Sequence, residues 1–233
     1  MSSGNAYHGK VGDHFAQMAG TSPYNAFTDR PAVLDLVGDV TGARVLDVGC
    51  GAGHYTEALL ERGAVVTGIE GSTTLLGHAR ERVGDRAELR AHDLEKPLDF
   101  AGDACFDVAV CALVHHHLTA REQLLSELLR VLRPGGRLVL STTHPTAEWL
   151  HHGNSYFDES WVDHPLPDPS LSIRYQRLTL ETLVTEWLSA GFALERLVEP
   201  RPLARLREVD EARYEKLGNE PSFLAARLRR PQP

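Results

Sequence analysis

From residue 43 onward, short apolar runs alternate with segments of helical periodicity. The apolar runs predict strands over 44–48, 65–70, 87–91, 106–114 and 137–142. The segments between them predict helices over 54–62, 72–83 and 120–132. The run VAVCALV has no polar interruption, which is typical of a strand that is covered on both faces. This alternation predicts an α/β fold, in which a parallel sheet carries helices on both sides.

The third of these helices has signals at both ends. Thr119 and Glu122 have the spacing of a capping box ahead of a leucine stripe. Pro134-Gly135-Gly136 predicts that the helix stops and turns into the next strand. Beyond them, helices are expected over 180–190 and 208–217, and strands over 192–198 and 223–228.

The length, net charge and apolar runs of the chain argue against several classes of function. The chain has 233 residues and a net charge of −8, which argues against a general attraction to nucleic acid or anionic lipid. Its longest apolar run, Val108 to Val114, is well short of the ~18 residues of a membrane span, and the polar start resembles no signal peptide. We therefore expect a cytoplasmic protein with reduced cysteines and no membrane partner.

Two segments interrupt the alternation. Residues 1–42 precede the first strand and predict an N-terminal helical cap, in front of a domain over 43–233. Residues 143–178 are longer than a plain loop in a compact domain, which predicts a lid insertion. Trp149, Tyr156, Phe157 and Trp161 are expected to give this lid an aromatic face toward a flat or hydrophobic ligand, unless they serve only its own packing.

The string VLDVGCGAG is the most informative motif. Gly49, Gly51 and Gly53 lie between a strand and a helix, where glycines allow a ligand to approach the backbone and the helix amides. Glu70 ends the next strand, at the distance where a carboxylate accepts hydrogen bonds from ribose hydroxyls. The spacing departs from the dinucleotide fingerprint, and no lysine follows as in a triphosphate-binding loop. The pattern predicts an adenosine-containing ligand.

With Asp47 before the glycines, the string resembles motif I of the class I S-adenosylmethionine-dependent methyltransferases. Asp93-Leu94 resembles the family's adenine-side acidic pair. FDVAVCALVHHHL and LLRVLRPGGRLVLS resemble its fourth strand, following helix and fifth strand. The resemblance covers 43–142, and SPYNAF and STTHP at its flanks look like small-molecule members from bacterial secondary metabolism.

This resemblance implies a Rossmann-like, mostly parallel seven-stranded sheet with helices on both faces and an antiparallel last strand. It also implies S-adenosylmethionine as cofactor and S-adenosylhomocysteine as product. The expected cofactor-binding residues are Asp47, Gly49, Cys50, Gly51, Gly53, Glu70, Gly71, Asp93, Leu94, Ala112 and Tyr7.

The candidate catalytic residues are His116, Tyr24 and His144. His116 aligns with the family histidine that faces the pocket, and histidine suits a general base near neutral pH. For the triplet His115, His116 and His117, a metal site and a polar loop with one packed and two solvated histidines are the alternatives. His144 is expected either to contact the acceptor or to cap the lid. Tyr7 and Tyr24 either close over the ligands or pack the helices.

Together these features predict an enzyme that methylates O, N or C of a small, largely hydrophobic or aromatic metabolite. Base-directed enzymes of this fold carry a proline-rich motif where this chain has Val114-His115-His116-His117, so nucleic acid is not expected as substrate. The alternatives are a non-methylating enzyme of the same fold, such as a cyclase, and a non-catalytic cofactor-binding protein. No metal is expected, and the chain is expected to be a monomer or a homodimer.

Overall fold

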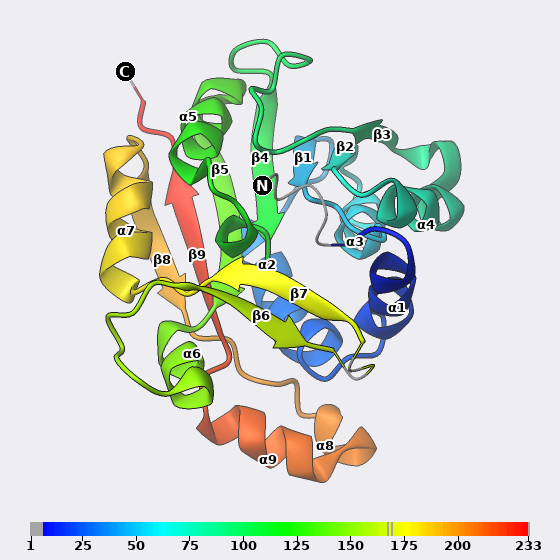
Figure 1. Ribbon diagram of the computed structural model, residues 1–233. Helices are drawn as coiled ribbons and strands as arrows, with labels where there is room; N and C mark the ends of the chain where they lie inside the picture. Colours follow the sequence, from blue (N-terminus) through cyan, green and yellow to red (C-terminus); the bar gives the residue numbers. More distant parts are fainter. Residues whose placement is uncertain (1–6, 167, 169, 233) are drawn as a thin grey trace.

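A seven-stranded sheet forms the centre of the computed structural model, which describes residues 7–166, 168 and 170–232 (Figure 1). The strand order is β3-β2-β1-β4-β5-β9-β8. The strands are β1 (Arg44–Val48), β2 (Val65–Glu70), β3 (Glu88–Ala91), β4 (Phe106–Ala112), β5 (Leu132–Thr143), β8 (Ala193–Val198) and β9 (Phe223–Arg229). Only β9 runs antiparallel to its neighbours, β5 and β8, in this sheet. The predicted Rossmann-like architecture is confirmed.

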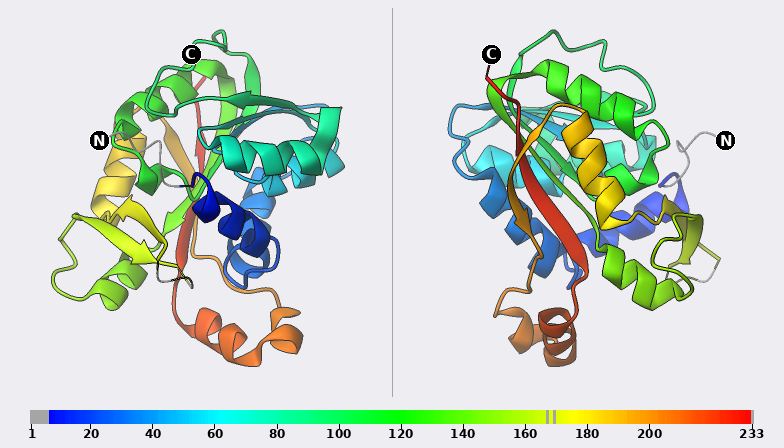
Figure 2. Two further views of the ribbon diagram at one scale, coloured as in Figure 1. Left: turned by 45° about the vertical axis from the view of Figure 1, so that its right-hand side comes forward. Right: turned by 90° about the vertical axis from the view of Figure 1, so that its left-hand side faces the viewer.

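Helices cover both faces of the sheet, as the views of Figure 2 show. Along β1, Val45 belongs to the apolar cluster that includes α2 (Arg30–Val37) and α3 (His54–Glu61). Its neighbour Leu46 belongs to the cluster that includes α5 (Arg121–Val131) and α7 (Leu180–Ser189). Because successive side chains of a strand point to opposite faces, this alternation separates the two layers of the core.

The remaining helices lie toward one end of the sheet or at its edge. They are α1 (Lys10–Ala19), α4 (Thr73–Val83), α6 (Pro145–His152), α8 (Leu206–Val209) and α9 (Glu211–Asn219). Residues 143–178 contain α6 and a two-stranded antiparallel sheet, β6 (Trp161–Pro165) with β7 (Ser172–Gln176). The first six residues of the predicted cap, and residues 167 and 169 of the predicted lid, lie outside the described residues. None of the described helices is both long and apolar enough to cross a membrane.

The capping-box prediction is wrong. The residue at the N-cap of α5 is Ala120, which makes no side-chain cap. Thr119 instead donates its hydroxyl to Glu95, 2.9 Å away, and the amide of Ala120 donates to the same carboxylate at 2.7 Å. A carboxylate from a loop distant in sequence therefore accepts the hydrogen bonds at the start of this helix. The spacing of nearby residues cannot indicate such an acceptor.

The boundary between α5 and β5 also differs from the prediction. The helix ends at Val131, but β5 begins directly at Leu132, which pairs with Phe106. Pro134-Gly135-Gly136 therefore lies inside the strand, at an irregularity where Gly135 has a φ of 75°. The glycine permits this irregularity without ending the strand.

Candidate functional site

A cavity of about 1050 Å³ lies at the carboxyl ends of β1, β2, β4 and β5. Its wall includes residues of the glycine loop after β1, the ends of β2 and β4, and the segment after β3. Further lining residues come from the α1 region, the segment 22–30, the α6–β7 region, α9 and the residues 220–223 that follow α9. Ligands of parallel α/β sheets bind at this end of the strands. One cavity thus joins the candidate cofactor residues to the segments that were expected to cover a substrate.

The glycines of the loop have different roles. Gly49 and Gly51 line the cavity with φ values of 67° and 56°, a backbone region that favours glycine. A Cβ on Gly51 would meet no atom within 4 Å, so its backbone faces open space. Gly53 does not line the cavity, and a Cβ there would lie 3.1 Å from Cα of Ala79. Gly53 therefore serves helix packing, whereas Gly51 leaves room for a ligand.

Glu70 is held at the cavity edge by two backbone amides. Its Oε2 accepts from the amide of Gly51 at 2.9 Å, and its Oε1 accepts from the amide of Ser72 at 2.8 Å. Burial raises the pKa of this carboxyl. Each oxygen keeps a further lone pair, so the carboxylate can also accept from a pair of ribose hydroxyls. The open glycine backbone and this fixed acid together fit the adenosine part of S-adenosylmethionine.

Other predicted cofactor residues also lie in the cavity wall. They are Cys50, Gly71, Asp93, Leu94, Ala112 and Tyr7. Asp93 Oδ1 accepts from the amide of Glu95 at 3.1 Å, which orients the carboxylate. Tyr7 is tied to the cofactor end because its carbonyl accepts from the hydroxyl of Ser72 at 2.6 Å. All cysteines in the described residues are free, as predicted.

Asp47 does not line the cavity. Its side chain is buried, and its Oδ2 accepts from the Thr56 hydroxyl at 2.6 Å. Burial, together with a smaller contribution from the charge of Glu70, raises the pKa of Asp47 to about 7, although the hydrogen bond from Thr56 opposes this shift. In this structure the residue joins β1 to α3 beneath the glycine loop, and any effect on the ligand would pass through the loop backbone.

The buried carboxyl of Asp47 predicts a pH-dependent stability. Its pKa is about 7 in the folded chain, whereas the ordinary value of an aspartate is 3.8, so the folded state binds the proton more tightly than the unfolded state. The free energy of unfolding should therefore fall, by ~2–4 kcal/mol, as pH rises from about 4 to about 7. Asp47→Asn should flatten this slope in chemical denaturation at several pH values. An unchanged slope in the variant would contradict the assignment to Asp47.

Arg30 is a candidate binding residue that sequence reasoning missed. It lines the cavity near the glycine loop, and its Nη2 donates to the carbonyl of Ala19 at 2.8 Å. Its buried Nε has no hydrogen-bond partner among the described residues. A guanidinium with an unpaired donor at a cavity is suited to a carboxylate ligand. Nothing in the local sequence marks this arginine, because the cavity forms only in the fold.

The three consecutive histidines form a short 3-10 turn after β4, and all three are buried. His115 Nε2 lies 3.2 Å from Glu186 Oε2, away from the cavity wall. His116 Nδ1 lies 2.9 Å from the Thr142 hydroxyl, and His117 Nδ1 is 2.8 Å from the carbonyl of Arg174. The alternative with two solvated histidines is wrong, and the three rings have three different partners.

His116 and His117 both line the cavity. Burial holds the pKa of His116 well below its usual value, and the neighbouring His117 and His115 lower it further. The imidazole is therefore neutral at pH 7 and can accept a proton or a hydrogen bond. Burial also lowers the pKa of His117.

The other two candidate catalytic residues differ in position. Tyr24 lines the cavity, and its hydroxyl accepts from Arg213 at 3.0 Å. His144 is not among the lining residues. Its Nδ1 accepts from the amide of Thr146 at 3.1 Å and caps α6, and its Nε2 lies 3.1 Å from Glu199. Of the two roles considered for His144, the structure gives it the capping contact.

The expected aromatic face is on the wrong side of the segment. Trp149, Tyr156, Phe157 and Trp161 do not line the cavity, and Phe157 is 77% exposed. The cavity wall there consists of Ala147, Glu148, Leu150, His151, His164, Pro165, Leu166, Ile173 and Tyr175. This part of the cavity wall is therefore mixed apolar and polar, and its rings are those of His151, His164 and Tyr175.

Comparison with known proteins adds to this geometry. Residues 46–140 match the family model described as a methyltransferase domain. A ubiquinone biosynthesis O-methyltransferase of Xanthomonas oryzae is 34% identical over 121 residues, 50% of this chain and 51% of that protein. The chain spans about half the length of the curated relatives it matches.

Two solved structures resemble the whole fold. An S-adenosylmethionine-dependent methyltransferase from Mesorhizobium loti has a TM-score of 0.69 at 26% identity, over 86% of this chain and 96% of that chain. A 1,6-didemethyltoxoflavin-N1-methyltransferase from Burkholderia thailandensis, solved with bound 1,6-didemethyltoxoflavin and S-adenosylhomocysteine, has a TM-score of 0.61 at 22% identity. It covers 95% of this chain and 88% of that chain, and shows a likeness of fold.

Proposed function

Because the chain carries a class I S-adenosylmethionine-dependent methyltransferase domain, we propose that it methylates a small, largely hydrophobic metabolite at O, N or C. The observation that carries this proposal is the single cavity of about 1050 Å³, with the glycine loop and Glu70 in one part of its wall and His116 in another. Such a volume is at the upper limit of small-molecule sites, which is ~1000 Å³. We also propose that the metabolite is a natural product, because the flanks of the domain look like those of methyltransferases from bacterial secondary metabolism.

The cofactor residues would hold the adenosine and amino-acid parts of S-adenosylmethionine. Glu70 would accept from the ribose hydroxyls, while Gly51 leaves the backbone open to the ligand. Asp93 and Leu94 would face the adenine, and the guanidinium of Arg30, which lines the cavity, would bind the carboxylate. When bound, this cofactor supplies an activated methyl group on a sulfonium.

His116 would act on the acceptor. Its Nδ1 is engaged by Thr142, which fixes the ring and leaves Nε2 for the substrate. Being neutral at pH 7, the ring would accept the acceptor's proton or orient the acceptor by a hydrogen bond. Tyr24 would contribute a hydroxyl to the same chamber. The main contribution of the protein is alignment and the exclusion of water, since the methyl group is already activated.

The substrate class can be tested with methyl-labelled S-adenosylmethionine. The purified protein is incubated with a bacterial small-molecule extract in one reaction, and with RNA or total protein in two others. We expect label in the organic-soluble small-molecule fraction alone. Label incorporated into RNA or protein instead would refute the proposed class of acceptor.

A further inference from the structure

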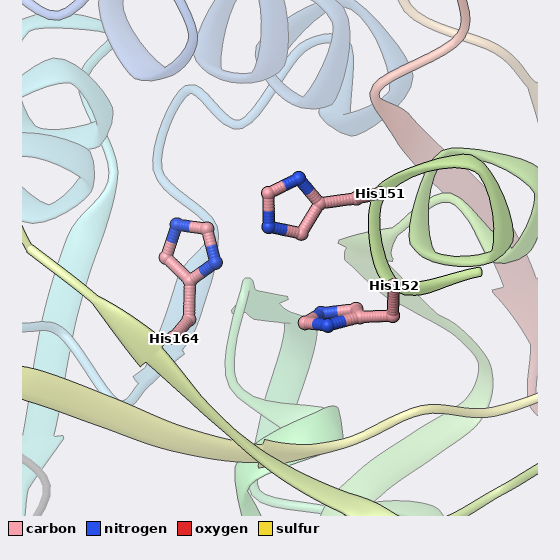
Figure 3. Close-up of side chains that lie close together, drawn as sticks. All are labelled: His151, His152 and His164. Carbon is pink, nitrogen blue, oxygen red and sulfur yellow. The ribbon is translucent and has the colours of Figure 1, made fainter.

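Three histidines of the segment 143–178 meet beside the cavity, although no metal site is expected from the sequence. They are His151, His152 and His164, and one ligand atom of each lies within 4.8 Å of the other two. Figure 3 shows the three rings around a common space, with two projecting from α6 and one from β6. The cluster is separate from the triplet after β4.

We propose that His151, His152 and His164 bind one divalent first-row transition-metal ion of the zinc class. Imidazole nitrogens bind such ions at ~2.0–2.1 Å, which places two nitrogens of one tetrahedral site ~3.4 Å apart. The three ligand atoms lie within 4.8 Å of one another, so rotations of the rings would have to close at most ~1.4 Å between any two of them. Two ligands on one helix and one on the adjoining strand make the set compact.

The local contacts favour a cation over simple ring packing. Nδ1 of His164 is buried and has no hydrogen-bond partner among the described residues. The ring centroids of His151 and His164 are 5.1 Å apart, and those of His151 and His152 are 4.6 Å apart. A buried nitrogen without a partner is costly, and this nitrogen could donate its lone pair to a metal ion.

The carboxylate of Glu148 lies beside one of the three histidines, where it could orient the ring. Oε2 of Glu148 lies 3.4 Å from Nε2 of His152, and the hydroxyl of Tyr175 donates to the same oxygen at 2.8 Å. A carboxylate against one nitrogen of a metal-binding histidine fixes the orientation of its ring. Glu148 is therefore a positioning residue of the proposed site.

The position of the ion gives it a role. His151, His164 and Glu148 line the cavity, so a fourth coordination position would open toward the acceptor end. The ion would also tie α6 to β6 across the connection 153–160. Metal binding is thus expected to stabilise this wall of the cavity, whether or not the protein transfers a methyl group.

The experiment uses tag-free protein, stripped with a chelator and titrated with Co²⁺ and then with Zn²⁺. We expect one ion per chain, a visible Co²⁺ spectrum of low-coordinate type, and a melting temperature higher by roughly 5 °C with saturating Zn²⁺. His151→Ala and His164→Ala should each weaken Zn²⁺ binding by ~10-fold or more. His78→Ala, a histidine of α4 outside the cluster, should bind like the wild type.

Two results would overturn the proposal. One is wild-type protein that binds no Zn²⁺ at roughly 100 µM, a concentration far above the dissociation constant expected for a three-histidine site. The other is unchanged binding in both cluster variants. Circular dichroism of the metal-free variants checks that they fold. His151→Ala removes an exposed ring and is therefore the variant expected to disturb the fold least.

Discussion

Replacing His116 by alanine is expected to lower kcat by ~10²-fold while the affinity for S-adenosylmethionine stays unchanged. The ring lines the cavity, is neutral at pH 7 and is oriented by Thr142. Its removal deletes the group that would accept the acceptor's proton, but it touches neither Glu70 nor the glycine loop. Steady-state kinetics on an identified acceptor, with calorimetry of cofactor binding, measures both effects.

The neighbouring histidine provides the matched control. His115 is also buried, but it pairs with Glu186 and does not line the cavity. His115→Gln should therefore change kcat by less than ~3-fold if the loss in His116→Ala reflects chemistry. Full turnover by His116→Ala would remove that residue from the mechanism, and equal losses in both variants would indicate a general disturbance of the turn.

Glu70→Ala is expected to weaken S-adenosylmethionine binding by ~10²-fold, about 2.7 kcal/mol. The variant loses the acceptor for two ribose hydroxyls. It also leaves the amides of Gly51 and Ser72 without the carboxylate they now contact. Each hydrogen bond to a charged group contributes ~1.5–3 kcal/mol, so the loss of the pair is large enough to produce an effect of this size. Isothermal titration with S-adenosylmethionine and S-adenosylhomocysteine measures it.

A glutamate on the next strand serves as control. Glu88 in β3 is exposed and pairs with Arg90, away from the cavity. Glu88→Ala should leave the dissociation constant within ~2-fold of the wild type. A Glu70→Ala protein that still binds the cofactor like the wild type would place the ribose elsewhere in the cavity.

The centre of the sheet was predictable because strands such as β1 and β4 are buried on both faces and therefore read as continuous apolar runs. The strand containing VAVCALV was found at the right place, although it ends at Ala112 rather than at 114. The pair β6 and β7 was missed because its burial is only partial and its sequence is largely polar. The start of β5 was missed because Pro134-Gly135-Gly136 lies within the strand.

Candidate ligand-binding residues were predictable where they lie close together in the sequence. Gly49, Gly51 and Glu70 belong to the continuous segment from β1 through α3 to β2, and all three line the cavity. Arg30 could not be found in this way, because it lies outside this unit and reaches the cavity wall only in the folded chain. The meeting of His151 and His164 likewise depends on how α6 packs against β6, which no spacing rule encodes.

The most direct test of the proposed function is the incubation of purified protein with S-adenosylmethionine and a panel of aromatic and peptide-derived metabolites. Mass spectrometry then follows each acceptor and S-adenosylhomocysteine together. We expect that one class of acceptor gains the mass of a single methylene and that an equal amount of S-adenosylhomocysteine is formed. An acceptor that is converted without a mass gain and without S-adenosylhomocysteine would contradict this expectation and indicate a non-methylating reaction.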